Sequence, residues 1–234
     1  MSYSYDAFKG DFSIKDLVDT SRYLRDFKRD HPDYFDPDGL ILFCGGQGQG
    51  KTLSAVRYLH RLCKMYPAAV IVSNIKLNIF DSGLQDPSEQ RIIEPYSGIN
   101  NVAKIDNGYK GVILFLDEIQ VEFSSLESAK IHPSVIQTIS QQRKRRLHVV
   151  GTTQLFKRLA KPWREQCNCI VDCDSLLRGK VQRNSLVDLG TIAEDSNGNL
   201  TSYDYSERTF WFRAKRYFDM YDTSQRVERV GGLK

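Results

Sequence analysis

Five short apolar segments recur along the chain, at 40–44, 68–74, 111–118, 147–154 and 169–173. Their continuous hydrophobicity is typical of parallel strands that are covered on both faces. Between them, 53–62 and 134–146 repeat apolar residues at the spacing of an amphipathic helix. In the second of these helices, Val135, Ile136 and Ile139 are expected to face the sheet. The alternation predicts an α/β fold with a mostly parallel central sheet flanked by helices and joined by right-handed crossovers.

The pattern changes after residue 180. The segment 181–189 and the aromatic-rich segment 203–221 are typical of antiparallel strands, and the turn sequence Ser-Asn-Gly-Asn lies between them at 196–199. We interpret this part as a C-terminal antiparallel β extension of the same domain.

The N-terminal part, 1–39, is predicted to be an arm followed by a helix, while 40–234 form the main domain. Ser13 can cap a helix that runs to about Phe27. Its apolar face contains Ile14, Leu17, Val18, Leu24 and Phe27. Its other side carries Arg22, Arg25, Lys28 and Arg29. This basic side is either a contact for DNA or a protein partner, or a solvated face.

The composition is that of a soluble protein inside a cell. A net charge of +4 permits a nucleic-acid partner without requiring one. The first residues have neither the positive flank nor the apolar core of a signal peptide, and no apolar run is long enough to span a membrane.

Three of the five cysteines, Cys167, Cys169 and Cys173, share one parity and are expected to line one face of a strand. They could bind a metal or belong to the core. Their spacing does not match a zinc ribbon, which favours core thiols. An odd cysteine count also indicates reduced thiols in a cytosol.

The segment 45–52 reads GGQGQGKT and fits the P-loop pattern G-x-x-x-x-G-K-[ST] between a predicted strand and a predicted helix. Its glycines let successive backbone N–H groups wrap phosphates, and the helix N-terminus adds a partial positive charge. Lys51 is expected to reach the β- and γ-phosphates of ATP, and Thr52 to place its hydroxyl on Mg²⁺. The predicted nucleotide-binding residues are Gly45, Gly46, Gln47, Gly48, Gln49, Gly50, Lys51, Thr52 and Leu53.

Two acids, Asp117 and Glu118, close the third apolar segment. Following a P-loop in a matching strand, they indicate a second nucleotide motif, in which Asp117 holds Mg²⁺ and Glu118 polarises the attacking water. Gln154 ends the next strand at the edge where ligands bind parallel sheets. It is a candidate for sensing the γ-phosphate or orienting the water.

A dense cationic run occupies 141–146 and includes Arg143, Arg145 and Arg146. Three interpretations stay open. Either one of the arginines serves as a finger for a neighbouring subunit's nucleotide, or the run binds the DNA backbone, or it is a solvated helix end favoured by the helix dipole.

Further basic residues either line a channel or belong to ordinary surface. They are Lys157, Arg158, Lys161, Arg164, Arg178, Lys180, Arg183, Arg213, Lys215 and Arg216. Trp163, which follows Pro162 among them, is predicted to pack inside the protein rather than stack on bases.

Together these residues carry a family likeness. The P-loop, the Asp117-Glu118 pair and the stretch from Arg143 to His148-Val-Val-Gly-Thr-Thr-Gln154 resemble the FtsK–HerA class of DNA-translocating ATPases. The strand end at 73–74, the sequence at 117–120 and the tail at 217–223 are most similar to the zonular-occludens-toxin-like branch. That branch contains filamentous-phage assembly proteins and is close to the packaging ATPases of membrane-containing viruses.

The resemblance implies a RecA-like P-loop NTPase of the ASCE group. It implies a ring of five or six copies with ATP between subunits, an arginine supplied in trans and DNA, expected to be double-stranded, in a basic pore. Arg143 best matches the position of the finger, and Gln154 that of the γ-phosphate sensor. A capsid or membrane-vertex protein is an implied partner, which places the protein in the host cytoplasm or at a packaging vertex of the virion.

The expected function is therefore an ATP-driven DNA translocase. The chain ends at Lys234 without a transmembrane segment beyond the ATPase, which favours a genome-packaging motor over a membrane-embedded assembly protein. The alternatives are a filamentous-phage-type extrusion ATPase and a nucleotide-dependent switch or scaffold that moves nothing. A P-loop kinase fits less well, because Glu118 directly after Asp117 suits water activation.

Overall fold

The computed structural model describes residues 13–37, 39–79, 93–130, 133–194, 200–202, 204–222 and 225–230. The predicted arm at 1–11 and the turn at 196–199 lie outside these residues. The chain divides into two compact units, 1–34 and 35–234.

In its described residues, 13–34, the first unit contains one helix, α1 (Ile14–Asp30). As predicted, Ser13 caps it, since its Oγ accepts a hydrogen bond from the Asp16 backbone N–H at 3.1 Å. The helix continues three residues beyond Phe27 to Asp30, and its C-cap residue His31 lies just before a proline. None of its residues is buried, so its apolar face stays accessible within this unit.

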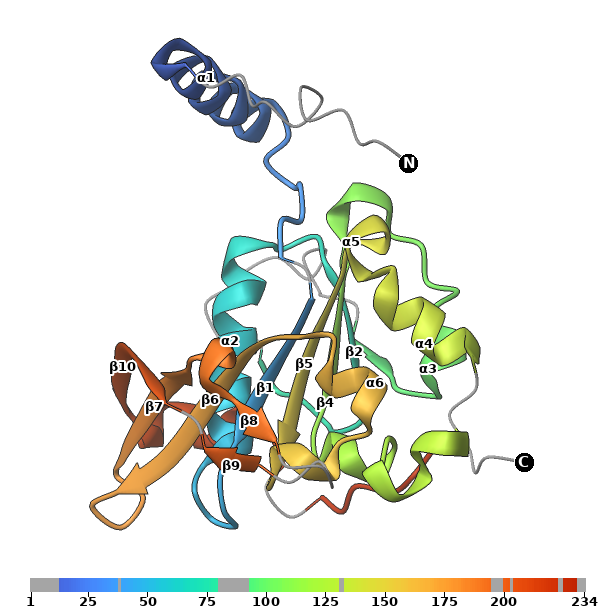
Figure 1. Ribbon diagram of the computed structural model, residues 1–234, viewed down its shortest axis with the longest axis vertical. Helices are drawn as coiled ribbons and strands as arrows, with labels where there is room; N and C mark the ends of the chain where they lie inside the picture. Colours follow the sequence, from blue (N-terminus) through green and yellow to red (C-terminus); the bar gives the residue numbers. More distant parts are fainter. Residues whose placement is uncertain are drawn as a thin grey trace, which may run out of the picture. The chain divides into compact units, whose positions relative to one another are not determined.

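The second unit is built on one eight-stranded sheet with the order β10-β7-β6-β1-β5-β4-β2-β3 (Figure 1). The parallel strands are β1 (Gly39–Cys44), β2 (Val70–Ser73), β3 (Ile93–Pro95), β4 (Val112–Leu116), β5 (Leu147–Thr153) and β6 (Cys167–Leu176). Strands β7 (Val181–Val187) and β10 (Tyr205–Arg213) continue the sheet in antiparallel pairing. A separate pair joins β8 (Ala193–Glu194) to β9 (Leu200–Ser202). The five predicted strands and the antiparallel extension are confirmed; the short β3 was not predicted.

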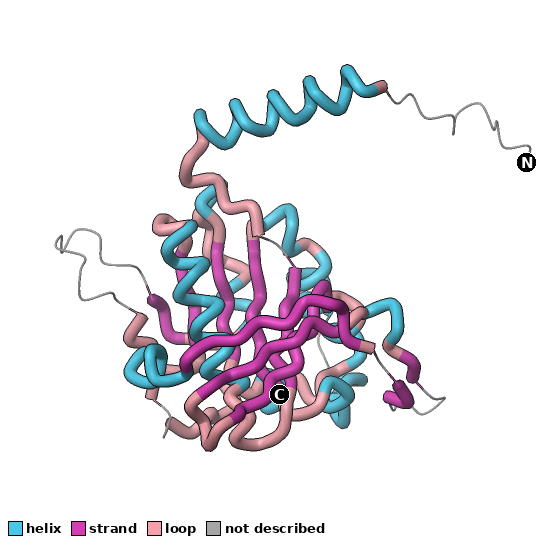
Figure 2. The backbone as a smooth tube through the Cα atoms, turned by 90° about the vertical axis from the view of Figure 1, so that its left-hand side faces the viewer, coloured by secondary structure: helices cyan, strands magenta, loops and turns pink. Residues whose placement is uncertain are grey.

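Helices pack on both faces of this sheet (Figure 2). Alternate residues of β1 enter two different cores: Leu40 and Leu42 join one, while Ile41 and Phe43 join the other. This double burial explains the continuous hydrophobicity of the strand sequences. The α-helices are α2 (Lys51–Met65), α3 (Ile99–Val102), α4 (Pro133–Ser140), α5 (Gln142–Arg145) and α6 (Lys161–Arg164). The 3₁₀ helices are η3 (Gly108–Lys110), η4 (Ile119–Val121), η5 (Ser125–Lys130), η6 (Phe156–Arg158), η7 (Leu189–Thr191) and η8 (Ala214–Met220).

Trp163 of α6 is fully buried, and its ring stacks on Phe123 with centroids 4.2 Å apart. The prediction that it packs inside the protein is confirmed.

The helix predicted at 134–146 is interrupted. Helix α4 ends at Ser140, and Gln141 leaves the helical conformation before the single turn of α5. Arg146 then adopts a positive φ of 50° that turns the chain into β5. Within α4, Val135 and Ile139 are buried, but Ile136 is 37% exposed, so its predicted inward orientation is wrong.

The cysteine prediction is wrong at one position because β6 contains a bulge. Leu40 pairs with Cys167 and Ile41 with Cys169, which leaves Asn168 as an extra residue. Cys167 consequently packs against one core, while Cys169 and Cys173 pack against the other. Burial raises the pKa of the Cys167 thiol to about 12. In the described part of the chain, no group of three or more His, Cys, Asp or Glu side chains could hold a metal ion.

Candidate nucleotide-binding and hydrolysis site

The predicted P-loop connects the carboxyl end of β1 to the first residue of α2. Gly45 and Gly50 have positive φ values of 152° and 70°. A Cβ at Gly45 would lie 2.6 Å from the Cys173 carbonyl oxygen, and one at Gly50 would collide with the Gln182 side chain. Both positions therefore require glycine for their backbone conformation and for lack of space.

Lys51 begins α2 and is buried, with 6% of its surface exposed. Its Nζ donates a hydrogen bond to the Gly46 carbonyl at 3.1 Å and lies 3.9 Å from Glu118 Oε1. The fold thus brings together the lysine and the glutamate that the two motifs predicted, although these motifs lie far apart in the sequence.

Asp117 sits between two threonine hydroxyls at the carboxyl edge of the sheet. Thr52 Oγ1 and Thr152 Oγ1 donate to Asp117 Oδ1 at 2.7 and 2.8 Å. Burial raises the pKa of the Asp117 carboxyl above its usual range, while the two hydroxyls oppose the rise. A bound cation would offset the unfavourable burial of this charge.

Thr52 and Asp117 fit the Mg²⁺ that the motifs imply. Their hydroxyl and carboxylate oxygens are hard donors of the kind that Mg²⁺ takes alongside substrate phosphates. The 2.7 Å hydrogen bond between Thr52 Oγ1 and Asp117 Oδ1 shows that the two side chains point to the same position. These two residues could hold the ion together with the phosphates.

Glu118 is held by contacts that sequence reasoning missed. It has a positive φ of 48°, its backbone N–H donates to Thr152 Oγ1 at 2.9 Å, and Gln120 Nε2 donates to its carboxylate. Next to it, the Asn74 side chain bonds both the N–H and the carbonyl of Asp117, each at 2.8 Å. The positions of Asn74 and Thr152 in the sequence could have indicated these contacts, because both are polar residues at the ends of apolar strands that flank β4.

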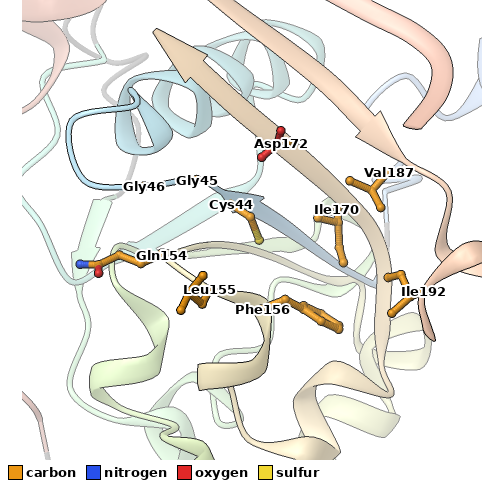
Figure 3. A pocket seen from close by; sticks show the side chains of 10 residues that line it. All are labelled: Cys44, Gly45, Gly46, Gln154, Leu155, Phe156, Ile170, Asp172, Val187 and Ile192. Carbon is orange, nitrogen blue, oxygen red and sulfur yellow. The ribbon is translucent and has the colours of Figure 1, made fainter. Parts of the chain in front are cut away.

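Gln154 follows β5 and lines a pocket of about 250 Å³ with Gly45 and Gly46 of the P-loop (Figure 3). Its Oε1 accepts a hydrogen bond from Arg158 Nη1 at 3.1 Å. The remaining lining residues are Cys44, Leu155, Phe156, Ile170, Asp172, Val187 and Ile192. The predicted sensor is therefore close to the phosphate-binding loop.

Arg143, Arg145 and Arg146 lie at the opposite edge of the sheet. They directly precede β5, whose seven residues span about 23 Å before the nucleotide edge is reached. Arg145 Nη1 donates to the Ala103 carbonyl at 2.6 Å. The three arginines are not brought to this chain's own P-loop.

The hairpin between β6 and β7 contacts the P-loop directly, which sequence reasoning also missed. Ser175 N–H donates to Gln49 Oε1, and Gln182 Nε2 donates to the Gln49 carbonyl, both at 2.9 Å. One turn further along, Ser54 Oγ donates to Asn184 Oδ1 at 2.8 Å. Gln182 and Asn184 occupy alternate positions of β7 and so share a face, and both are buried, but neither segment alone indicates these contacts.

None of the described helices combines the length and the apolar character that a membrane crossing requires.

Similarity to one solved structure supports this architecture. The N-terminal domain of zonular occludens toxin from Neisseria meningitidis matches at 19% identity and a TM-score of 0.53, covering 79% of this chain and 98% of that one. The genome packaging NTPase B204 from Sulfolobus turreted icosahedral virus 2, in complex with ATP-gammaS, matches at 17% identity and 0.45, covering 58% and 74%. The flagellar accessory protein FlaH from Methanocaldococcus jannaschii matches at 13% identity and 0.46, covering 75% and 84%. No curated protein matches the chain.

The chain has the RecA-like P-loop ATPase fold that the sequence predicted. The sequence model of the family described as Zonular occludens toxin (Zot) matches residues 39–225. That match contains the P-loop, Asp117, Glu118, Gln154 and the hairpin between β6 and β7. The resemblance to this branch is confirmed, and the chain belongs to the zonular occludens toxin (Zot) family.

Proposed function

We propose that this protein hydrolyses ATP and uses the energy to move DNA, most specifically as a subunit of a viral genome-packaging motor. The observation that carries the proposal is the convergence of four side chains at one edge of the sheet. Lys51, Thr52, Asp117 and Glu118 come from two motifs and are joined by contacts of 2.7 to 3.9 Å. This is the set of groups that ATP hydrolysis requires.

Each group has a distinct role in this proposal. Lys51 neutralises phosphate charge, and Glu118 accepts a proton from the attacking water. Mg²⁺, held by Thr52 and Asp117, would supply charge neutralisation and a template for the triphosphate. Gln154, beside Gly45 and Gly46, senses the γ-phosphate.

The position of the arginines supports a ring of five or six copies with shared ATP sites. Because Arg143, Arg145 and Arg146 lie at the edge opposite the P-loop, they can act as fingers only on the nucleotide of another subunit. Inactive Lys51→Ala subunits mixed with inactive finger variants should then recover part of the activity. If no mixing ratio restores hydrolysis, the sites are not shared.

A second candidate is an extrusion ATPase of the filamentous-phage type, because the family model that matches residues 39–225 is that of zonular occludens toxin, and the zonular-occludens-toxin-like branch contains filamentous-phage assembly proteins. The two functions differ in their partners. A packaging motor would copurify with a capsid or vertex protein and prefer double-stranded DNA. An extrusion ATPase would copurify with a membrane protein and prefer single-stranded DNA.

The proposal is tested by the rate of ATP hydrolysis of the purified protein without DNA, with single-stranded DNA and with double-stranded DNA, at a low and a high salt concentration. We expect stimulation by DNA that falls as salt rises, because binding to phosphates releases counterions. Lys51→Ala should abolish the rate in both conditions. If the rate of ATP hydrolysis is unchanged by both single- and double-stranded DNA, the protein is a nucleotide-dependent switch and not a DNA motor.

A further inference from the structure

The hairpin between β6 and β7 ends in a strained turn. Leu177 and Arg178 have φ values of 51° and 56°, and the Gly179 N–H closes the turn on the Leu176 carbonyl at 3.1 Å. Hairpin turns with two successive positive φ values favour Asn-Gly or Asp-Gly. A leucine in this conformation is an outlier, and such strain concentrates at functional sites.

The turn is exposed and strongly basic. Leu177 is 71% exposed, and the side chains of Arg178 and Lys180 are exposed beside it. The end of β10 lies next to them, because the Ala214 N–H donates to the Lys180 carbonyl at 3.1 Å. Segments 175–187 and 208–218 contain seven cations and no acidic residue. These cations are Arg178, Lys180, Arg183, Arg208, Arg213, Lys215 and Arg216.

One of these cations is neutralised within the hairpin. Arg183 Nη2 lies 2.7 Å from Asp174 Oδ2, on the strand opposite. Arg178 and Lys180 lie beyond this pair, at the turn itself. They are therefore the two cations of the hairpin that are best placed to meet an anionic partner.

This basic tip projects beyond the nucleotide edge of the sheet. Strand β1 ends at Cys44, which pairs with Asp172, whereas β6 continues in the same direction to Leu176 (Figure 1). The tip therefore lies on the side of the P-loop, unlike the arginines that precede β5.

The tip is also joined to the P-loop through a short path. Ser175 and Gln182 are cross-strand partners, and both hold Gln49. A single further pair, Leu176 with Val181, separates them from the turn. Gln182 is fully buried, and Gly50 leaves no room beside its side chain, so a shift of the hairpin has to displace the loop.

We propose that the β6–β7 tip binds the phosphate backbone of DNA through Arg178 and Lys180, and that Gln182 and Ser175 transmit this binding to the P-loop through Gln49. The inference rests on the proposed function and assigns its DNA contact and its means of stimulation. A surface with this excess of cations matches the charge of a duplex backbone. The shared residue Gln49 gives bound DNA a direct way to change the nucleotide site.

The binding step is tested with the double variant Arg178→Ala, Lys180→Ala. Its matched control is Lys104→Ala, Lys110→Ala, which removes the same charge near the amino end of β4. Anisotropy of a fluorescent DNA duplex is measured over a salt series. We expect the tip variant to bind more weakly and the slope of log affinity against log salt to fall by about two, one for each lost phosphate contact. The control should match the wild type.

The coupling step is tested with Gln182→Met, which keeps the length of the side chain but removes the amide that holds Gln49. We expect it to bind the duplex like the wild type while losing most of the stimulation of ATP hydrolysis. A thermal unfolding curve checks that this buried variant folds. The exposed tip variant supplies an independent test if it does not.

The outcomes separate this inference from the proposed function. A wild type that neither binds DNA nor responds to it contradicts both. A stimulated wild type with a tip variant identical to the lysine control overturns the inference alone. A tip variant that binds DNA normally but loses DNA-independent hydrolysis also overturns it, because the cations would then act on nucleotide phosphates.

Discussion

The parallel and antiparallel parts of the sheet contribute to the nucleotide site in different ways. Strands β1, β4 and β5 are buried along their whole length, and their site residues appear where a strand ends, as with Asp117 and Thr152. Strand β7 is buried only at Gln182, Asn184 and Val187, and its contacts to the nucleotide region come from within the strand, at Gln182 and Asn184. The parallel part contributes residues at the ends of its strands, and the antiparallel part contributes residues on one face of β7.

This difference separates two tasks. The strand ends of the parallel part carry the groups that touch phosphates, metal and water. The face of β7 touches the P-loop and the first turn of α2, and so can adjust the site without joining the chemistry. Substitutions in the parallel part should therefore alter the rate of ATP hydrolysis. Substitutions in the antiparallel part should instead alter the stimulation of hydrolysis by DNA and the stability of the fold.

The largest expected effect is that of Glu118→Gln. Glutamine keeps the shape of the side chain but cannot accept a proton, so ATP hydrolysis should fall by about 10²- to 10⁴-fold. ATP binding should persist, because Lys51 and Thr52 are unchanged. Phosphate release gives the rate, and titration with a fluorescent ATP analogue gives the affinity.

Glu122→Gln is the matched control for this variant. Glu122 lies one turn further along, where it accepts hydrogen bonds from the Tyr96 hydroxyl and the Val230 N–H at 3.3 and 3.1 Å. The Glu122→Gln variant should hydrolyse ATP at the rate of the wild type. Normal turnover in Glu118→Gln would mean that another group activates the water.

The sequence predicted features that are local and missed those that depend on distant pairing. Continuous apolar runs predicted the five strands, and the spacing of Gly45, Gly50 and Lys51 predicted the P-loop. The bulge at Asn168 could not be predicted, because it depends on the register of β6 against β1. The contact of Gln182 with Gln49 joins residues 133 positions apart, and nothing in either segment alone indicates it.

A smaller effect is expected from Asn74→Ala. The Asn74 side chain holds the backbone N–H and carbonyl of Asp117. Loss of a residue that positions a metal ligand typically lowers activity or metal affinity by about 10- to 100-fold. The Mg²⁺ concentration for half-maximal hydrolysis should rise, which a general loss of stability would not produce. Asn101→Ala is the control, since Asn101 bonds Ser97 at an exposed site. An unchanged Mg²⁺ requirement would contradict the positioning role of Asn74.

The smallest effect, and the one that most directly tests the strand-face argument, is the difference between Asn184→Ala and Ser185→Ala. The two residues are neighbours in β7 but face opposite sides. Asn184 is buried and accepts from Ser54 Oγ, so its loss should lower the free energy of unfolding by about 1–3 kcal/mol. Ser185 bonds Thr209 at an exposed site, where substitutions usually change stability by less than about 0.5 kcal/mol. Urea unfolding measures both. Equal effects would show that the buried face of β7 does not stabilise the P-loop helix. In that case there would be no structural reason to assign the reacting groups to the parallel strands and the adjustment of the site to β7.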